Sequence, residues 1–159
     1  MKSDCTSFQF DIITDDYVFD KICNLSNNKS PGLDGFQAKL LKLAAPTICK
    51  PLAYICNLSL LTSTFPSEWK QAKVTPIFKD GDKSDVGNYR PISVLSVVSK
   101  ILERAVHDQL YSYLTTNSIL HPSQSGFRSG HSTKSALLDV SDFILNNMNE
   151  GRVTAAIFF

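Results

Sequence analysis

The last seven residues of the chain, VTAAIFF at positions 153–159, constrain its fold more than any other stretch. They combine β-branched and aromatic residues with no charge and no proline, a composition typical of a strand buried on both faces. Such a strand needs hydrogen-bonding partners on its edges and other elements that cover its faces. The run therefore predicts that this part of the chain belongs to a sheet.

The rest of the chain is mostly helical in pattern. Apolar residues recur at helical spacing in four stretches, whose ends are marked by capping residues and by proline. These stretches are 14–25, capped by Thr14; 36–63, interrupted at Pro46; 96–114; and 132–149, capped by Ser132. In the last helix we expect Ala136, Val140, Phe143 and Ile144 to face inward.

Two short strands are predicted between the second and third helical stretches. They are KVTPIFK (73–79) and the YRPISVL stretch (89–95), joined by the polar connector DGDKSDVGN. Pro76 restricts the first strand to a sheet edge or a bulge. We therefore expect an α+β fold: a helix-rich unit with a two-stranded hairpin, followed by the first strand of an incomplete sheet.

The composition is that of a globular protein, with 43% hydrophobic and 19% charged residues. A formal net charge of +1 neither requires nor excludes a polyanionic partner. The four cysteines, at 5, 23, 49 and 56, form no CxxC pair and the three histidines are dispersed, which argues against a zinc site. Reduced thiols, no signal peptide and no membrane-spanning apolar run predict an intracellular protein without membrane contact.

The predicted hairpin carries cations on both sides of its connector. Lys79 ends the first strand and Arg90 begins the second, so antiparallel pairing can bring them together. Lysine as a point charge and arginine as a planar fork suit a polyphosphate. The alternative is a solvated rim neutralised by the aspartates of the connector, at 80, 82 and 85.

Two glycine-containing loops are further candidates for binding. In SQSGFRSGHST, Gly126 permits close backbone approach, Phe127 offers a stacking face and Arg128 offers a phosphate or base contact. The alternative is a tight turn in which Phe127 fills a core. In KSPGLDG, Asp34 is placed to cap the following helix or to close a turn, and the loop lacks the GK[ST] ending of a P-loop.

Taken together, four stretches resemble the reverse transcriptases of non-LTR retrotransposons. They are KSPGLDG, FPSEWKQAKVTPIFKDGD, NYRPISVLSVVSKILER and HPSQSGFRSGHST, in this order and at these distances, and the similarity extends from about Phe8 to Phe159. The resemblance implies part of an RNA-directed DNA polymerase. It divides the chain into a lead-in and template-side segment (1–35), the fingers (36–131) and the start of the palm (132–159).

The resemblance also assigns roles to individual residues. It implies that Lys79 and Arg90 hold the triphosphate of the incoming deoxynucleoside triphosphate. It places the following residues beside the nucleotide or the template: Lys73, Asp34, Gly35, Gln124, Gly126, Phe127 and Arg128. The implied partners are an RNA template and a DNA primer.

The catalytic carboxylates of the family lie beyond the motifs quoted above. In the family the strand equivalent to VTAAIFF leads into an aspartate, and paired aspartates follow further on, together holding Mg²⁺. We therefore expect no catalytic or metal-binding residue in this chain, no polymerase activity from it alone, and a truncated enzyme. The alternative is a non-catalytic remnant that binds nucleic acid or protein; an unrelated helical interaction protein would require the four motifs to coincide by chance.

Overall fold

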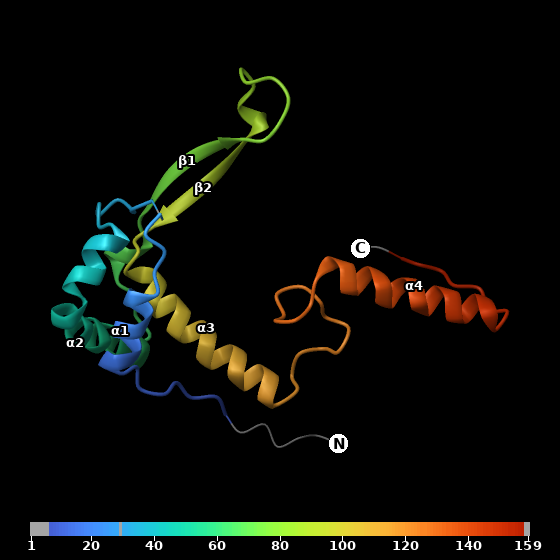
Figure 1. Ribbon diagram of the computed structural model, residues 1–159, viewed down its shortest axis with the longest axis horizontal. Coiled ribbons are helices and arrows are strands. Elements are labelled where there is room, and N and C mark those ends of the chain that lie inside the picture. The colour runs from blue at the N-terminus through green and yellow to red at the C-terminus, as the bar shows by residue number, and fades with distance from the viewer. Residues whose placement is uncertain (1–6, 29, 158–159) are drawn as a thin grey trace. The chain divides into compact units, whose positions relative to one another are not determined.

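The computed structural model describes residues 7–28 and 30–157, and within them the chain adopts an α+β fold (Figure 1). The elements are α1 (Asp15–Cys23), α2 (Ala38–Thr62), β1 (Ala72–Phe78), β2 (Tyr89–Leu95), α3 (Ser99–Thr116) and α4 (Thr133–Asn149), with short 3-10 turns at Ser67–Lys70 and Val86–Asn88. The chain forms two compact units, Met1–Tyr113 and Leu114–Phe159, which are described separately.

The core of the first unit lies among α1, α2 and the first half of α3. The predicted start of α1 is confirmed, because the Thr14 hydroxyl oxygen accepts a hydrogen bond from the Tyr17 amide at 3.1 Å. Val18 and Ile22, one turn apart, are both fully buried. The buried hydrophobic residues are Ile13, Val18, Ile22, Ala38, Leu41, Ala45, Ala53, Cys56, Val97, Ile101, Leu102 and Ala105.

The predicted interruption of the second helical stretch at Pro46 is wrong. One helix, α2, continues through both Pro46 and Pro51, and Figure 1 shows it changing direction along its length. Each proline removes one helical hydrogen bond, but α2 buries Leu41 before them and Cys56 after them. Because both halves pack against the core, they stay in one helix. The same burial raises the pKa of the Cys56 thiol to about 11.

The extended lead-in before α1 is held by two side-chain amides. The Asn57 side chain accepts from the Ile13 amide and donates to the Ile13 carbonyl, both at 2.8 Å. The Gln109 side chain does the same with Asp11, at 2.8 and 3.1 Å. These amides replace a neighbouring strand, because they satisfy backbone groups of a segment that belongs to no sheet.

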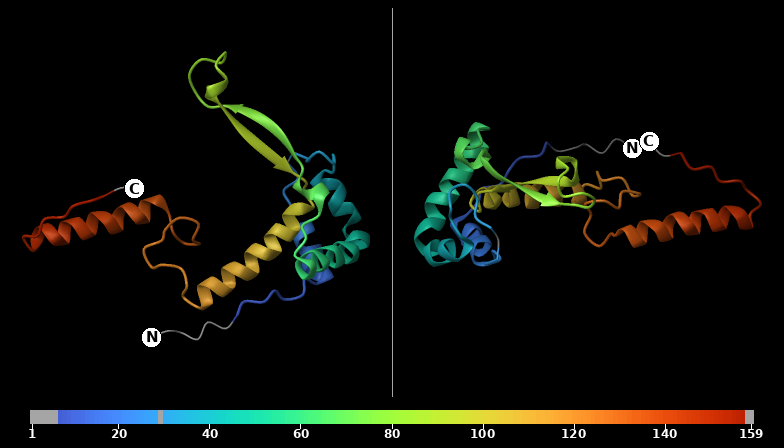
Figure 2. Two further views of the ribbon diagram at one scale, coloured as in Figure 1. Left: turned by 180° about the vertical axis from the view of Figure 1, so that it is seen from behind. Right: turned by 90° about the horizontal axis from the view of Figure 1, so that it is seen from above.

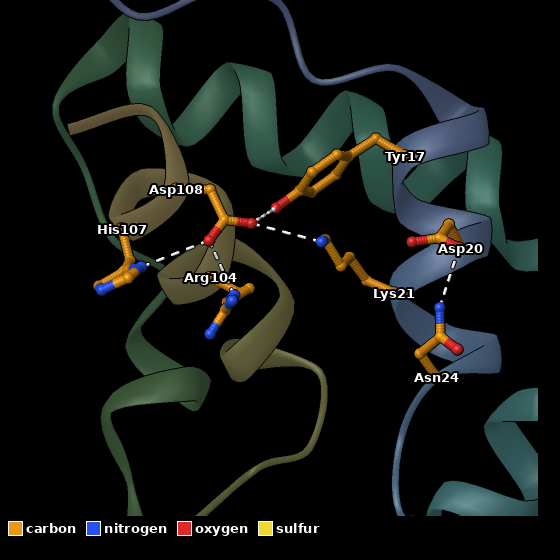
Figure 3. Close-up of polar contacts among 7 residues, drawn as sticks. All are labelled: Tyr17, Asp20, Lys21, Asn24, Arg104, His107 and Asp108. Carbon is orange, nitrogen blue, oxygen red and sulfur yellow. Dashed lines mark hydrogen bonds and ion pairs between the residues drawn. The ribbon is translucent and has the colours of Figure 1, made fainter. Parts of the chain in front are cut away.

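One carboxylate connects α1 to α3. Asp108 accepts a hydrogen bond from the Tyr17 hydroxyl at 3.0 Å and lies 3.3 Å from Lys21 Nζ and 2.8 Å from Arg104 Nε (Figure 3). Its other neighbour is His107, at 3.3 Å. Burial raises the pKa of Asp108, but the hydrogen bonds and the Arg104 charge together outweigh it and hold the pKa below its ordinary value.

The predicted hairpin is confirmed, with β1 and β2 paired antiparallel from Ala72↔Leu95 to Phe78↔Tyr89. It extends away from α1 and α2 (Figure 1). The Lys79 amide donates to the Asn88 carbonyl at 2.8 Å, so these two residues form a hydrogen-bonded pair. In an antiparallel ladder, hydrogen-bonded and non-hydrogen-bonded pairs alternate. Counting back along the register, Pro76↔Pro91 is a non-hydrogen-bonded pair. Neither proline therefore removes a hydrogen bond from this ladder.

The second unit consists of a loop, α4 and the segment after it. Ser132 caps α4 as predicted, by accepting from the Ser135 amide at 3.2 Å. The expected inward face of α4 forms only in part in the described residues: Ala136 and Ile144 are half-buried, but Val140 and Phe143 are exposed and no residue of α4 is fully buried. No element of the described unit packs over that face closely enough to bury it.

The strand predicted at the end of the chain is likewise not formed in the part that the structure describes. Residues 152–157 carry no strand and double back along α4 (Figures 1 and 2). They are fixed by the Asn147 side chain, which donates to the Thr154 hydroxyl at 3.2 Å, while Val153 and Ile157 are exposed. A strand requires a hydrogen-bonding neighbour, which 152–157 lack here; residues 158 and 159 lie outside the described part.

Candidate functional site

The register of the hairpin places three predicted cations on one face. Side chains alternate between faces along a strand, so Lys73, Ile77 and Lys79 share a face, and Arg90, which is paired with Ile77, lies on it too. All three cations are exposed. Val74, Pro76 and Phe78 point to the opposite face, where Nζ of Lys83, from the connector, lies 5.7 Å from the centroid of the Phe78 ring. Lys73, Lys79 and Arg90 thus share a face that is distinct from the one Lys83 covers.

Lys79 and Arg90 are neighbours on that face. Lys79 stands diagonally across from Arg90, an arrangement in which β-carbons lie roughly 7–8 Å apart. Long cationic side chains can converge over that distance on one polyphosphate. Lys73 shares the face but lies six residues along β1, about 20 Å away at the strand rise, at the other end of the hairpin.

The aspartates of the connector do not neutralise these cations. Among the described residues, neither Lys79 nor Arg90 forms an ion pair within 4 Å. Asp82 and Asp85 instead close turns in their own loop, since each accepts a backbone amide hydrogen bond at 2.9 Å, from Ser84 and Gly87. The Ser84 backbone lowers the pKa of Asp82 accordingly.

Gly32 and Asp34 of the KSPGLDG motif lie against the base of the hairpin. A β-carbon added at Gly32 would lie 2.7 Å from the Ser96 amide nitrogen and 2.9 Å from the Leu95 carbonyl carbon, so only glycine fits there. Asp34 accepts hydrogen bonds from the Ser96 hydroxyl and from the Phe36 amide. It closes a turn, as predicted on local grounds, and also ties the loop to the end of β2.

These contacts put two of the template-side candidates near a third. Lys73 pairs with Val94, directly before the Leu95–Ser96 junction that Gly32 and Asp34 contact. Gly35 has a φ of +71° and open space around its α-carbon, so the backbone there is accessible. The first unit thus carries candidate residues at both ends of the hairpin: Lys79 and Arg90 beside the connector, and Lys73, Asp34 and Gly35 at its base.

The remaining candidates belong to a loop of the second unit. One terminal nitrogen of Arg128 donates to the His121 carbonyl at 3.1 Å and to the Gln124 carbonyl at 3.4 Å. The Gln124 side chain donates to the Gly126 carbonyl at 3.2 Å. Arg128 and Gln124 therefore organise their own loop.

Phe127 is the outward-facing residue of that loop. It is 102% exposed and has a φ of +60°, a conformation that a bulky residue adopts rarely. The alternative in which Phe127 fills a core is wrong for the described structure. Its ring is presented to solvent at the tip of the loop, with Gly126 beside it and no atom within 4 Å of that glycine's missing β-carbon.

Two absences concern the described residues only. The described residues contain no group of three or more histidine, cysteine, aspartate or glutamate side chains that could hold a metal ion. None of the described helices is long and apolar enough to cross a bilayer.

Sequence reasoning missed the residues that hold the candidates in place. Gly32 and Ser96 have no local signal, because their contact joins segments far apart in the sequence. Lys100, Arg104 and Asp108 do have one, since their i, i+4, i+8 spacing places the three side chains on one helix face.

The comparisons with known proteins agree with the motifs. The family model described as reverse transcriptase (RNA-dependent DNA polymerase) matches residues 79–157. The chain is 34% identical over 142 residues, 89% of its length, to the probable RNA-directed DNA polymerase from transposon BS of Drosophila melanogaster. It is 31% identical over 153 residues, 96% of its length, to the RNA-directed DNA polymerase from mobile element jockey of the same species.

A third relative comes from another type of element. This relative is the retrovirus-related Pol polyprotein from type-1 retrotransposable element R1 of Bradysia coprophila. The chain is 32% identical to it over 123 residues, 76% of the chain. The matched segment makes up 16%, 17% and 12% of these three relatives, so the chain spans less than a fifth of their length. Together, the family match and these relatives show that the chain belongs to the reverse transcriptase family, in the group encoded by non-LTR retrotransposons.

Proposed function

We propose that this chain contributes the nucleotide- and template-binding part of an RNA-directed DNA polymerase, with Lys79 and Arg90 binding the triphosphate of the incoming nucleotide. The observation that carries the proposal is their placement as diagonal neighbours on one hairpin face without an ion pair among the described residues. Each charge-assisted hydrogen bond to phosphate would contribute about 1.5–3 kcal/mol.

The other candidates extend this role toward the template. Lys73, Asp34 and Gly35 lie at the base of the hairpin, where an RNA template would run. Phe127 supplies a stacking face, with Gly126 leaving room for a base, while Gln124 and Arg128 fix the loop that presents it. On this proposal residues 36–131 form the fingers, preceded by a template-side segment (1–35) and followed by the start of the palm (132–159).

In the whole polymerase, a DNA primer and catalytic Mg²⁺ would complete the reaction centre. The described residues do not fit a metal site, since their carboxylates are dispersed or close turns of their own loop. The role of this part is thus to bind and orient, and the chemistry requires other groups. We also propose an intracellular setting, which suits the free thiols of Cys23, Cys49 and Cys56.

The proposal is tested by measuring the binding of labelled deoxythymidine triphosphate, in the presence of Mg²⁺, to the full chain and to two hairpin variants. Lys79→Ala and Arg90→Ala should each weaken binding roughly tenfold or more, because each removes a charge-assisted contact. Lys50→Ala, which removes an exposed lysine from α2, is the control and should bind like the unmodified chain. Equal affinity in all four proteins would contradict the assignment.

A further inference from the structure

A second cationic site lies away from the hairpin face. A cavity of about 430 Å³ opens between the end of α1 with its following turn and the first half of α3. Its lining residues are Lys21, Asn24, Leu25, Ser26, Lys100, Ile101 and Arg104. Three of these seven side chains are cations, contributed by two different helices, and none of the lining residues is acidic.

The nearby acids leave an excess of positive charge. Asp108 lies 3.3 Å from Lys21 and 2.8 Å from Arg104, so one carboxylate is shared between two cations (Figure 3). Lys100 has no ion pair among the described residues. The other two neighbouring acids do not line the cavity: Asp20 accepts from the Asn24 side chain at 2.9 Å, and Glu103 accepts from the Ser99 hydroxyl at 3.3 Å.

The cations retain donors that can face a ligand. Arg104 contacts Asp108 through Nε, which leaves both terminal amino groups without a partner among the described residues, and its side chain is 61% exposed. Lys21 is held in place by Asp108 and by the Tyr17 ring, whose centroid is 4.8 Å from Nζ. One guanidinium and two ammonium groups that line the same cavity form a donor set suited to a phosphate.

We infer that this cavity binds a phosphate group of a nucleic-acid strand. Its volume exceeds what a lone phosphate fills, so the ligand should continue beyond the phosphate, as a phosphodiester chain does. Asp108 positions Lys21 and Arg104 in advance, which lowers the entropy lost on binding. The inference rests on the proposed function in that the ligand is nucleic acid, but it involves none of the hairpin residues.

The test is the salt dependence of binding to a fluorescein-labelled single-stranded RNA, followed by fluorescence anisotropy with the full chain. Lys100→Ala should weaken binding severalfold at low salt. The slope of log K against log salt is negative, and the substitution should make it less steep by about 0.7, because one phosphate contact is lost. Lys100→Glu should weaken binding further. Lys50→Ala, which removes the same charge elsewhere, should leave the slope unchanged.

Two further measurements separate this site from the hairpin and from free phosphate. Lys100→Ala should bind deoxythymidine triphosphate as tightly as the unmodified chain, whereas Lys79→Ala and Arg90→Ala should not, so the two proposals fail independently. Titration calorimetry with inorganic phosphate identifies the ligand source. An unchanged RNA slope in both Lys100 variants overturns the inference, and saturable binding of inorganic phosphate with that unchanged slope would assign the cavity to a free anion instead.

Discussion

Asp108 is the residue that accepts both the Tyr17 hydrogen bond and the Lys21 ion pair between α1 and α3. Replacing it with alanine removes the acceptor of the Tyr17 hydroxyl and the partner of Lys21 and Arg104. We expect Asp108→Ala to lower the free energy of unfolding by about 1.5–3 kcal/mol, the range for hydrogen bonds to a charged group. Urea denaturation checks this, with Asp20→Ala as the control, since the Asp20 carboxylate accepts a hydrogen bond from the exposed Asn24 side chain and bonds no residue of α3 in the described part of the chain. Equal losses in both variants would contradict the prediction.

The same residue makes stability depend on pH. Because the pKa of Asp108 is lowered in the folded chain, its contribution is present above the ordinary carboxyl pKa and is lost as the pH falls through the lowered folded value. The unmodified chain should therefore lose its advantage over Asp108→Asn progressively as the pH falls below the ordinary carboxyl pKa, about 4. Urea midpoints of both proteins above and below that pH provide the measurement, and a constant difference would refute it.

Gly32 is the residue that allows the loop of residues 30–35 to approach the base of the hairpin. A β-carbon there would lie under 3.0 Å from backbone atoms of Leu95 and Ser96, which cannot rotate away. We expect Gly32→Ala to destabilise the chain by about 1–3 kcal/mol, as overpacking does. Gly126→Ala is the matched control, because no atom lies within 4 Å of its added β-carbon. Thermal unfolding of the two variants should differ clearly.

At the scale of elements, α4 and the segment after it expose apolar surface in the described structure. The exposed large apolar residues are Leu137, Leu138, Val140, Phe143, Leu145, Met148, Val153 and Ile157. The hairpin differs, because Pro76 and Pro91 remove donors from its two outer edges and so oppose edge-to-edge pairing. The stretch 153–159 has no such protection, since it contains neither proline nor charge.

We therefore predict that the chain self-associates through 153–159. Deleting these residues should lower the apparent mass at high concentration, measured by light scattering against dilution. Phe143→Ser, which changes the exposed face of α4 instead, serves as the comparison. If the deletion leaves association unchanged while Phe143→Ser reduces it, the contact belongs to α4 and the prediction for 153–159 fails.

For the molecule as a whole, we predict that the chain binds nucleotide without transferring it to a primer. The proposed function assigns binding contacts to this chain and no catalytic group, so we expect the 159-residue chain to incorporate no labelled nucleotide into a primed RNA template with Mg²⁺ or Mn²⁺. Cations can position a nucleotide, but phosphoryl transfer needs groups that stabilise the attacking and leaving oxygens. Incorporation above a heat-inactivated control would show the prediction to be wrong.

The sequence by itself determined the local features of this protein. The caps at Thr14 and Ser132, the hairpin and the grouping of Lys79 with Arg90 all depend on residues within one turn or on strand alternation, which a single sequence displays. The four motifs also sufficed for the family, because each is a contiguous stretch. One local prediction is wrong: Pro46 does not interrupt α2. Helix propensity takes account only of neighbours along the chain and not of the packing that holds both halves of the helix.

Only the tertiary structure decided the features that join distant segments. Asp34 meets Ser96 across 62 positions, and Asp11 meets Gln109 across 98. The cavity between α1 and α3 brings Lys21 together with Lys100 and Arg104, and Lys21 and Arg104 share one carboxylate, that of Asp108. Whether α4 and residues 153–157 are buried likewise depends on which elements pack against them, and periodicity shows only that a face is apolar, not what covers it.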